Sequence, residues 1–193
     1  MAAVTEDNKT IARYAAQVFG GHPSVTRFWD DNHKSWVDLL KSEDQPQKGV
    51  SSYATIGLSD WPLIQDGEEY PARLEMVGAC GNQFGRFDNA LATAAFCIIN
   101  SKWFCFPGAI FPDVLRMHKC SRTMPHFLFV PPFLWDDKLQ TMDLKGSKIA
   151  WLMAIPISET ERRFAEKNGA DKLQDLFVAH QIDVFDLERK SVV

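Results

Sequence analysis

One segment constrains this chain more than any other: residues 90–99 read ALATAAFCII. These residue types favour a helix from about Asp88 to Asn100, and it is apolar nearly all round, so it must be covered on every side. The run of ten residues is too short to cross a bilayer. Because a chain of 193 residues is long enough to bury a core, we predict a globular protein built around this helix.

The segments around this helix carry strand and helix patterns in an irregular order. An amphipathic helix is expected over Glu6–Phe19, with Thr5 as its N-cap and Gly20-Gly21 at its end. Strands are expected at 25–29 and 35–40, joined as a hairpin by the turn 30–34, and at 53–58, 72–80, 126–130, 149–155 and 183–187. Because strands and helices do not alternate regularly, the order predicts an α+β fold with a mainly antiparallel or mixed sheet packed with helices. We expect a single domain over residues 1–193.

The clearest local signal is the sequence SETE at 158–161. Ser158 lies three residues before Glu161, which is the spacing of a capping box, and it predicts a helix that runs to about Lys167. A second helix is expected over residues 171–180. We expect Pro156 to end the strand that precedes the capping box.

Charge and cysteine usage limit the partners and the compartment. The net charge is −4, whereas a nucleic-acid binder is usually strongly basic, so no direct contact with nucleic acid is expected. The chain start MAAVTEDNKT lacks a secretory pattern, and no segment is long enough for a membrane span. None of the four cysteines forms a CxxC pair, so we expect reduced, buried thiols in a cytoplasmic protein.

The sequence carries no catalytic or nucleotide-binding motif. A metal cluster of His118, Cys120 and His126 would lack a fourth ligand, and polar loop residues with a buried thiol are the favoured reading. A cysteine nucleophile is the other alternative, but Cys105 lies between Phe104 and Phe106, an apolar setting that raises a thiol pKa. We therefore expect no enzyme, no cofactor and no metal.

The tryptophans divide into two groups. Trp36 and Trp151 lie within strand patterns and are expected in the core. Trp61, Trp103 and Trp135 lie in expected loops, where an aromatic side chain either caps the sheet or anchors a protein partner.

Several segments resemble the suppressor of fused domain family in the order in which that family has them. YATIGLSD at 53–60 is similar to an aromatic-led strand ending in GLSD, and RLEMVGAC at 73–80 to the strand that follows it. NALATAAFCIINSKWFCFPGAIF at 89–111 resembles the central helix and the loop after it. HFLFV at 126–130, KIAWLMAIPISETE at 148–161 and LQDL at 173–176 follow in the family order.

The resemblance implies an α+β fold and a protein-binding function. Animal members carry a second domain and restrain zinc-finger transcription factors, whereas stand-alone members of this length are largely bacterial and look like immunity proteins. The implied partner is a cognate secreted polymorphic toxin, with the LXG-type nuclease toxins as the nearest example. The alternative is a regulatory adaptor that binds an extended peptide by strand addition, as animal members do.

The family resemblance and the charge pattern together suggest a partner surface. An inhibitor of a basic nuclease can present carboxylates for steering and aromatic side chains for a desolvated hot spot. Two loops offer both residue types, and the family aromatic on the central helix falls on Phe96, whereas its aspartate falls near Ala109 and is missing. The candidate partner-binding residues are Asp60, Trp61, Asp66, Glu68, Glu69, Phe96, Trp103, Trp135, Asp136 and Asp137.

Overall fold

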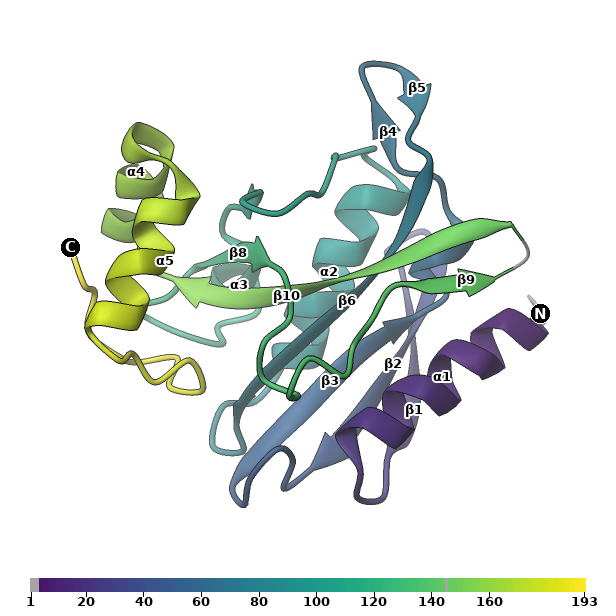
Figure 1. Cartoon of the computed structure of the whole chain (residues 1–193), viewed down its shortest axis with the longest axis horizontal. Helices are drawn as coiled ribbons and strands as arrows, with labels where there is room; N and C mark the ends of the chain where they lie inside the picture. Colours follow the sequence, from purple (N-terminus) through teal and green to yellow (C-terminus); the bar gives the residue numbers. More distant parts are fainter. Residues whose placement is uncertain (1–3, 145) are drawn as a thin grey trace.

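A large mixed sheet forms the centre of the molecule, with helices on both of its faces (Figure 1). The computed structural model describes residues 4–144 and 146–193. The strands are β1 (Ser24–Trp29), β2 (Trp36–Glu43), β3 (Val50–Ile56), β4 (Ile64–Gln65), β5 (Glu68–Glu69), β6 (Ala72–Gly81), β7 (Ile110–Phe111), β8 (His126–Val130), β9 (Met142–Leu144) and β10 (Ser147–Ile157). The helices are α1 (Glu6–Phe19), α2 (Phe87–Ile99), α3 (Val114–Met117), α4 (Glu159–Asn168) and α5 (Ala170–Ala179), with a 3₁₀ turn η1 (Leu58–Asp60).

The sheet has the order β1-β2-β3-β6-β10-β8-β7, and β9 pairs with β10 outside this path. Among the strand pairs of this sheet in the described residues, only β6 and β10 are parallel, with Leu74 opposite Ala150, while the others are antiparallel. Parallel neighbours need a long crossover, and here it contains α2, α3 and β8. The prediction of an α+β fold with a mixed sheet is confirmed.

Helix α2 is buried against one face of the sheet, as its apolar sequence predicts. Its first residue, Phe87, is fully buried, with the rings of Tyr53 and Phe127 at 5.2 and 5.4 Å. A Cβ atom at Gly78 of β6 would lie 2.8 Å from the Phe87 ring. This glycine therefore lets the helix approach the centre of the sheet closely.

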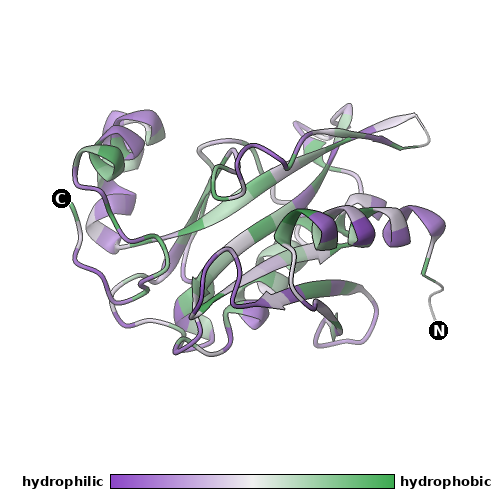
Figure 2. Ribbon diagram, turned by 60° about the horizontal axis from the view of Figure 1, so that its bottom comes forward, coloured by the Kyte–Doolittle hydropathy of each residue, from purple (hydrophilic) through white to green (hydrophobic). Residues whose placement is uncertain are grey.

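Helix α1 covers the opposite face, and it begins and ends where the sequence predicts. The Thr5 hydroxyl accepts a hydrogen bond from the Asn8 amide at 3.1 Å, and Gly20 ends the helix with φ +75°. Ile11 and Ala15 are fully buried against the sheet. Figure 2 shows hydrophobic residues concentrated in the strands and mixed hydropathy along α1, which suits a helix with one covered side.

The predicted capping box begins α4. The Glu161 amide donates to the Ser158 hydroxyl at 3.1 Å, and the Ser158 amide donates to the Glu161 carboxylate at 2.8 Å. Helix α5 follows immediately after Gly169, and Leu173 and Phe177 bury its apolar side. Both helices lie at one end of the sheet (Figure 1).

Pro156 does not end its strand, contrary to the prediction. β10 continues to Ile157, and Pro156 stands opposite Phe127 of β8. The pairing of β10 with β6 reaches only Met153. The Pro156 carbonyl accepts a hydrogen bond from the Arg189 side chain, so the backbone N and O of Pro156 point to the side of β10 that no strand pairs at this position. The N–H that proline lacks is therefore not needed for a hydrogen bond between strands.

The predicted strand at 183–187 is also wrong, because this segment forms turns. The Asp183 carboxylate accepts from the Phe185 amide at 2.9 Å, and the Asp186 carboxylate accepts from the Glu188 amide at 2.8 Å. Aspartate side chains that bond to the backbone two residues on compete with sheet pairing. Leu187 at the end of this segment is nevertheless fully buried in the core.

Candidate functional site

A buried glutamate holds the turn that follows β3. The chain leaves β3 at Gly57, whose φ of +90° favours glycine, and enters η1. The Glu75 carboxylate is fully buried and accepts from the Thr55 hydroxyl at 2.6 Å, the Gly57 amide at 3.0 Å, and the Ser59 amide and hydroxyl at 3.1 and 2.7 Å. Burial raises the pKa of Glu75 to about 7, against the effect of these hydrogen bonds. The buried Glu75 carboxylate therefore fixes the conformation of this turn.

Asp60 and Trp61, two of the predicted site residues, stand on this turn and already have partners within the protein. The Asp60 carboxylate is exposed, yet it accepts from the side-chain amide of the buried Asn8 at 2.9 Å and so ties α1 to the turn. Trp61 is half-buried against the core under α2, and the Lys102 ammonium lies 5.8 Å from its ring centre. Both residues therefore make contacts that stabilise the fold.

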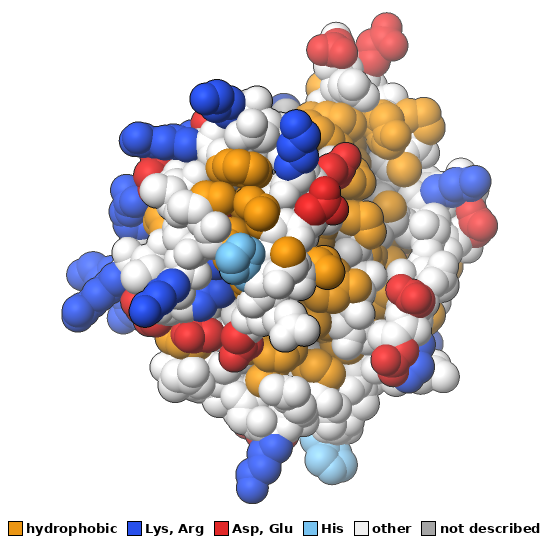
Figure 3. Space-filling model, turned by 60° about the vertical axis from the view of Figure 1, so that its left-hand side comes forward, with side chains coloured by type: hydrophobic (Ala, Val, Ile, Leu, Met, Phe, Trp, Pro, Cys, Tyr) orange, Lys and Arg blue, Asp and Glu red, His pale blue; other side chains and the backbone are white. Residues whose placement is uncertain are grey.

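The predicted acidic residues Asp66, Glu68 and Glu69 project on a short hairpin. Asp66 and Gly67 form its two-residue turn, with φ of +53° and +86°, between β4 and β5. Glu69 pairs with Arg73, whereas no hydrogen bond or ion pair is found for the carboxylates of Asp66 and Glu68 within the described residues. Figure 3 shows acidic side chains at the top of the molecule, where the hairpin lies in Figure 1, above an area where hydrophobic side chains gather.

Aromatic side chains line the extended segment after α2, next to this hairpin. Cys105 points inward and is buried, which raises its thiol pKa well above the ordinary value, as the sequence predicts. Trp103 and Phe106 on either side are 39% and 48% exposed. The Phe104 ring lies between those of Tyr70 and Phe106, at 5.3 and 5.6 Å.

We call this surface the acidic–aromatic patch. Acidic side chains of the β4–β5 hairpin adjoin a row of partly exposed rings, so the patch combines the two residue types that the sequence suggests for a partner surface. A cleft of about 540 Å³ extends from it along Phe106, Ala109 and Phe111 towards α4 and α5. The patch consists of Asp66, Glu68, Glu69, Tyr70, Trp103, Phe104 and Phe106.

Trp135, for which the sequence leaves open a cap on the sheet or a partner anchor, is buried in the structure. Its side chain is only 4% exposed, its ring lies 4.9 Å from that of Phe19, and its indole N–H donates to the Ser52 hydroxyl at 3.2 Å. It therefore belongs to the core beside α1 and offers no surface to a partner. Asp136 and Asp137 remain exposed next to it.

The two predicted partner loops do not form one surface. The loop between β8 and β9, with Asp136 and Asp137, runs below β10 in Figure 1, whereas the β4–β5 hairpin stands at the top. Phe96 lies in a third place, a cleft beside α2. The structure thus separates the candidate residues into the acidic–aromatic patch, the Asp136–Asp137 loop and the cleft at Phe96.

The cysteines and histidines do not assemble into a reactive centre. Burial raises the pKa of Cys80 to about 12 and those of Cys97 and Cys120 to about 11. His118 bonds to the Thr93 hydroxyl at 2.7 Å, and His126 bonds to Glu159 at 2.9 Å. Within residues 4–144 and 146–193, no group of three or more His, Cys, Asp or Glu side chains is arranged to hold a metal ion.

None of the helices in the described part of the chain is both long and apolar enough to cross a membrane.

Comparison with known proteins identifies the family to which this fold belongs. The suppressor of fused protein (SUFU) family matches residues 33–190, and the chain belongs to that family. It is similar to the immunity protein YqcF of Bacillus subtilis (strain 168), with 47% identity over 190 residues that cover 98% of this chain and 99% of YqcF.

Solved structures show the same fold at low sequence identity. A putative SUFU homolog from Neisseria gonorrhoeae superposes with a TM-score of 0.71 at 18% identity, covering 97% of each chain. Suppressor of Fused from Drosophila gives a TM-score of 0.64 at 14% identity, over 96% of this chain and 51% of that protein. A chain of a Sufu–Fu complex gives 0.63 at 13% identity, over 96% of this chain and 92% of the other.

Proposed function

We propose that this chain is an immunity protein that binds and neutralises a cognate secreted toxin. Its 47% identity to the immunity protein YqcF over nearly the full length of both chains carries the proposal. The absence of a catalytic motif in the sequence agrees with it, because neutralisation requires a tight complex and no chemistry.

The acidic–aromatic patch is the proposed contact surface. Trp103 and Phe106 are half-exposed rings held by their neighbours, so they can bury apolar area in a complex at little cost in side-chain entropy. Asp66 and Glu68 stand at its rim, where they attract a positively charged partner and raise the association rate. Asp60 and Trp61 lie on the turn that precedes the hairpin in the chain.

The charge of the patch favours a nuclease as the toxin. A nuclease site that binds phosphate carries lysine and arginine, and an inhibitor that covers it competes with nucleic acid by presenting carboxylates. A toxin of the LXG type with a nuclease domain fits this description.

A co-expression experiment tests the proposal. The toxin domain encoded beside this chain's gene should stop growth of a bacterial host when expressed alone, and this chain should restore growth. Binding of a catalytically inactive form of the toxin is measured by calorimetry. Undiminished toxicity together with no detectable binding would contradict the immunity function.

Two matched pairs of variants test the patch. Phe106→Ser should weaken toxin binding by about thirtyfold, as expected for a hot-spot side chain worth ~2 kcal/mol. Phe133→Ser is its control, because Phe133 is 51% exposed, similar to the 48% of Phe106, and lies outside the patch. Asp66→Asn with Glu68→Gln should lower the association rate several-fold at low salt.

The control for the acidic pair is Asp136→Asn with Asp137→Asn, which makes the same change in net charge on the other loop. Asn tolerates the positive φ of Asp66, Asp136 and Asp137, so backbone strain is not introduced. Equal weakening by the patch variants and their controls would mean that the toxin binds elsewhere.

A regulatory adaptor that binds an extended peptide by strand addition is the second candidate. β7 ends the sheet on one side, and the cleft of about 540 Å³ runs beside it past Ala109. Capture of several proteins that share one short linear sequence would favour the adaptor, whereas capture of a single toxin domain favours immunity.

A further inference from the structure

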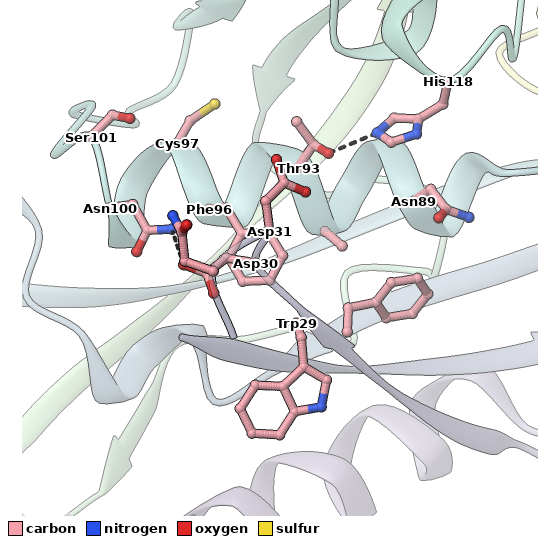
Figure 4. Close-up of a pocket in the computed structure, with 13 residues that line it drawn as sticks. Trp29, Asp30, Asp31, Asn89, Thr93, Phe96, Cys97, Asn100, Ser101 and His118 are labelled. Atoms are coloured by element: carbon pink, nitrogen blue, oxygen red, sulfur yellow. Dashed lines mark hydrogen bonds between the residues drawn. The ribbon is translucent and has the colours of Figure 1, made fainter. Parts of the chain in front are cut away.

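A second cleft lies between the β1–β2 turn and the outer side of α2, and the patch does not use it. It has a volume of about 390 Å³. Trp29, Asp30 and Asp31 line it from the turn, and Phe96 and Asn100 line it from α2 (Figure 4). We call it the turn–helix cleft.

The two aspartates of the turn have different surroundings. One Asp30 oxygen accepts from the amides of Lys34 and Ser35 at 2.7 and 3.2 Å, and the other accepts from the Asn100 side-chain amide at 3.3 Å. Asp30 therefore shapes the turn and fastens it to α2. Asp31 is exposed, no partner for its carboxylate is found in the described part of the chain, and Figure 4 shows it pointing into the cleft.

The rest of the lining is aromatic or neutral. Phe28 and Phe96 are partly buried at the wall of the cleft, whereas the 40% exposed indole of Trp29 points away from α2 (Figure 4). Among the described residues, no lysine or arginine lines the cleft. His118 bonds to the Thr93 hydroxyl, and burial lowers its pKa, so the imidazole is neutral at pH 7.

This combination fits one kind of group. Two carboxylates without a cation disfavour phosphate or carboxylate ligands, and the polar turn disfavours a purely apolar ligand. A guanidinium group is planar, binds a carboxylate through paired N–H donors and lies favourably over an aromatic ring, whereas an ammonium group lacks the flat face. The Asn100 amide oxygen accepts from the Ser35 hydroxyl at 2.7 Å and keeps a second lone pair for one of the remaining guanidinium donors.

We propose that the turn–helix cleft receives an arginine side chain of the toxin, with Asp31 as its carboxylate partner. This inference rests on the proposed function, because it takes the arginine from the toxin. The position of the cleft is suitable: Ser101 lies at its edge and Trp103 lies in the patch, with only Lys102 between them in sequence. One partner can therefore contact both surfaces.

The first test uses a small arginine probe and needs no toxin. N-acetyl-arginine amide is titrated into the ¹⁵N-labelled chain, and amide signals of residues in the cleft, such as Asn100 and Thr93, are followed by NMR. They should shift and saturate with the arginine probe. N-acetyl-citrulline amide, which has nearly the same shape without the charge, should leave them unmoved.

Matched variants identify the carboxylate. Asp31→Asn should weaken binding of the arginine probe at least fivefold, because it removes the unpaired charge. Asp175→Asn makes the same charge change on the exposed side of α5 and should leave binding unchanged. The inference is overturned if the arginine probe shifts no cleft signal, if citrulline binds equally, or if Asp31→Asn binds as well as the wild type.

The toxin provides the second test and separates the two proposals. Asp31→Asn should weaken the complex with the inactive toxin about tenfold, while Asp175→Asn should not. Neutralisation that Asp31→Asn leaves unchanged would overturn this inference and spare the immunity function. If the chain binds the arginine probe but does not bind the toxin, the arginine does not come from the toxin, and the immunity function is overturned as well.

Discussion

Glu75 shows how one residue can position a whole turn. Its carboxylate is fully buried and satisfies donors on Thr55, Gly57 and Ser59, while the next residues, Asp60 and Trp61, reach the surface. Each of these buried donors would cost about 1–3 kcal/mol if left without an acceptor. The same burial disfavours the charged form of the carboxylate, so the stability that this turn contributes depends on pH.

We predict that the stability conferred by Glu75 falls as pH rises. Burial raises the pKa of Glu75 from its model-compound value of 4.5 to about 7 in the folded protein, so the folded chain holds this proton more tightly than the unfolded chain. The contribution is fully present below about pH 4.5 and is lost as pH rises through 7. The pKa shift of Glu75 corresponds to a contribution to the free energy of unfolding of ~3 kcal/mol.

Urea unfolding from pH 4 to pH 8 measures this effect against Glu75→Gln, which has nearly the same shape and does not titrate. The free energy of unfolding of the wild type should fall relative to that of the variant as pH increases. Parallel curves for the two proteins would show that Glu75 keeps an ordinary pKa.

At the scale of elements, short sequence signals predict structure correctly where nearby residues satisfy the backbone hydrogen bonds or the backbone conformation of a helix or turn. The capping box of α4 closes within Ser158–Glu161, and the Asp66-Gly67 turn of the β4–β5 hairpin needs only two residues with positive φ. The dipeptide Asp-Gly is therefore a sequence signal for the hairpin. Strands of two or three residues, such as β7, carry too short a pattern to be recognised.

Ser158→Ala should lower the free energy of unfolding by about 1 kcal/mol, because the Glu161 amide loses its side-chain acceptor at the start of α4. The measurement is urea unfolding at pH 7. Ser24→Ala, at the exposed start of β1, is the control and should change stability by less than about 0.5 kcal/mol. An equal effect of the two substitutions would contradict a stabilising role of the cap.

On the scale of the whole molecule, the C-terminal segment joins the two cores on opposite faces of the sheet. Leu187 is fully buried in the core under α2, whereas Ile182, Phe185 and Val192 contact the core that includes α1 and α5. Arg189 fastens this segment to the helical end of the molecule. Its guanidinium donates to both carboxylate oxygens of the buried Glu161, at 2.6 and 2.9 Å, and to the Pro156 carbonyl at 3.1 Å.

Arg189→Met should lower the free energy of unfolding by ~3–5 kcal/mol, because it leaves the Glu161 charge buried without its partner. Thermal or urea unfolding measures the loss. Arg13→Met, on the exposed side of α1, is the control and should have little effect. A stability near that of the wild type for Arg189→Met would mean that the C-terminal segment is held mainly by its apolar contacts.

Local sequence patterns suffice to predict the elements that organise their own backbone or show one clear period: α1 with its Thr5 cap, the buried α2, the capping box of α4 and most of the longer strands. Tertiary structure decided the rest. The spacing of apolar residues in a segment predicts that one side of the segment is covered, but it does not predict which residues cover it. The contact of Trp135 with Phe19 and the burial of Leu187 in the core could therefore not be predicted from the sequence. The turn–helix cleft and the acidic–aromatic patch likewise exist only because the sheet brings distant segments together.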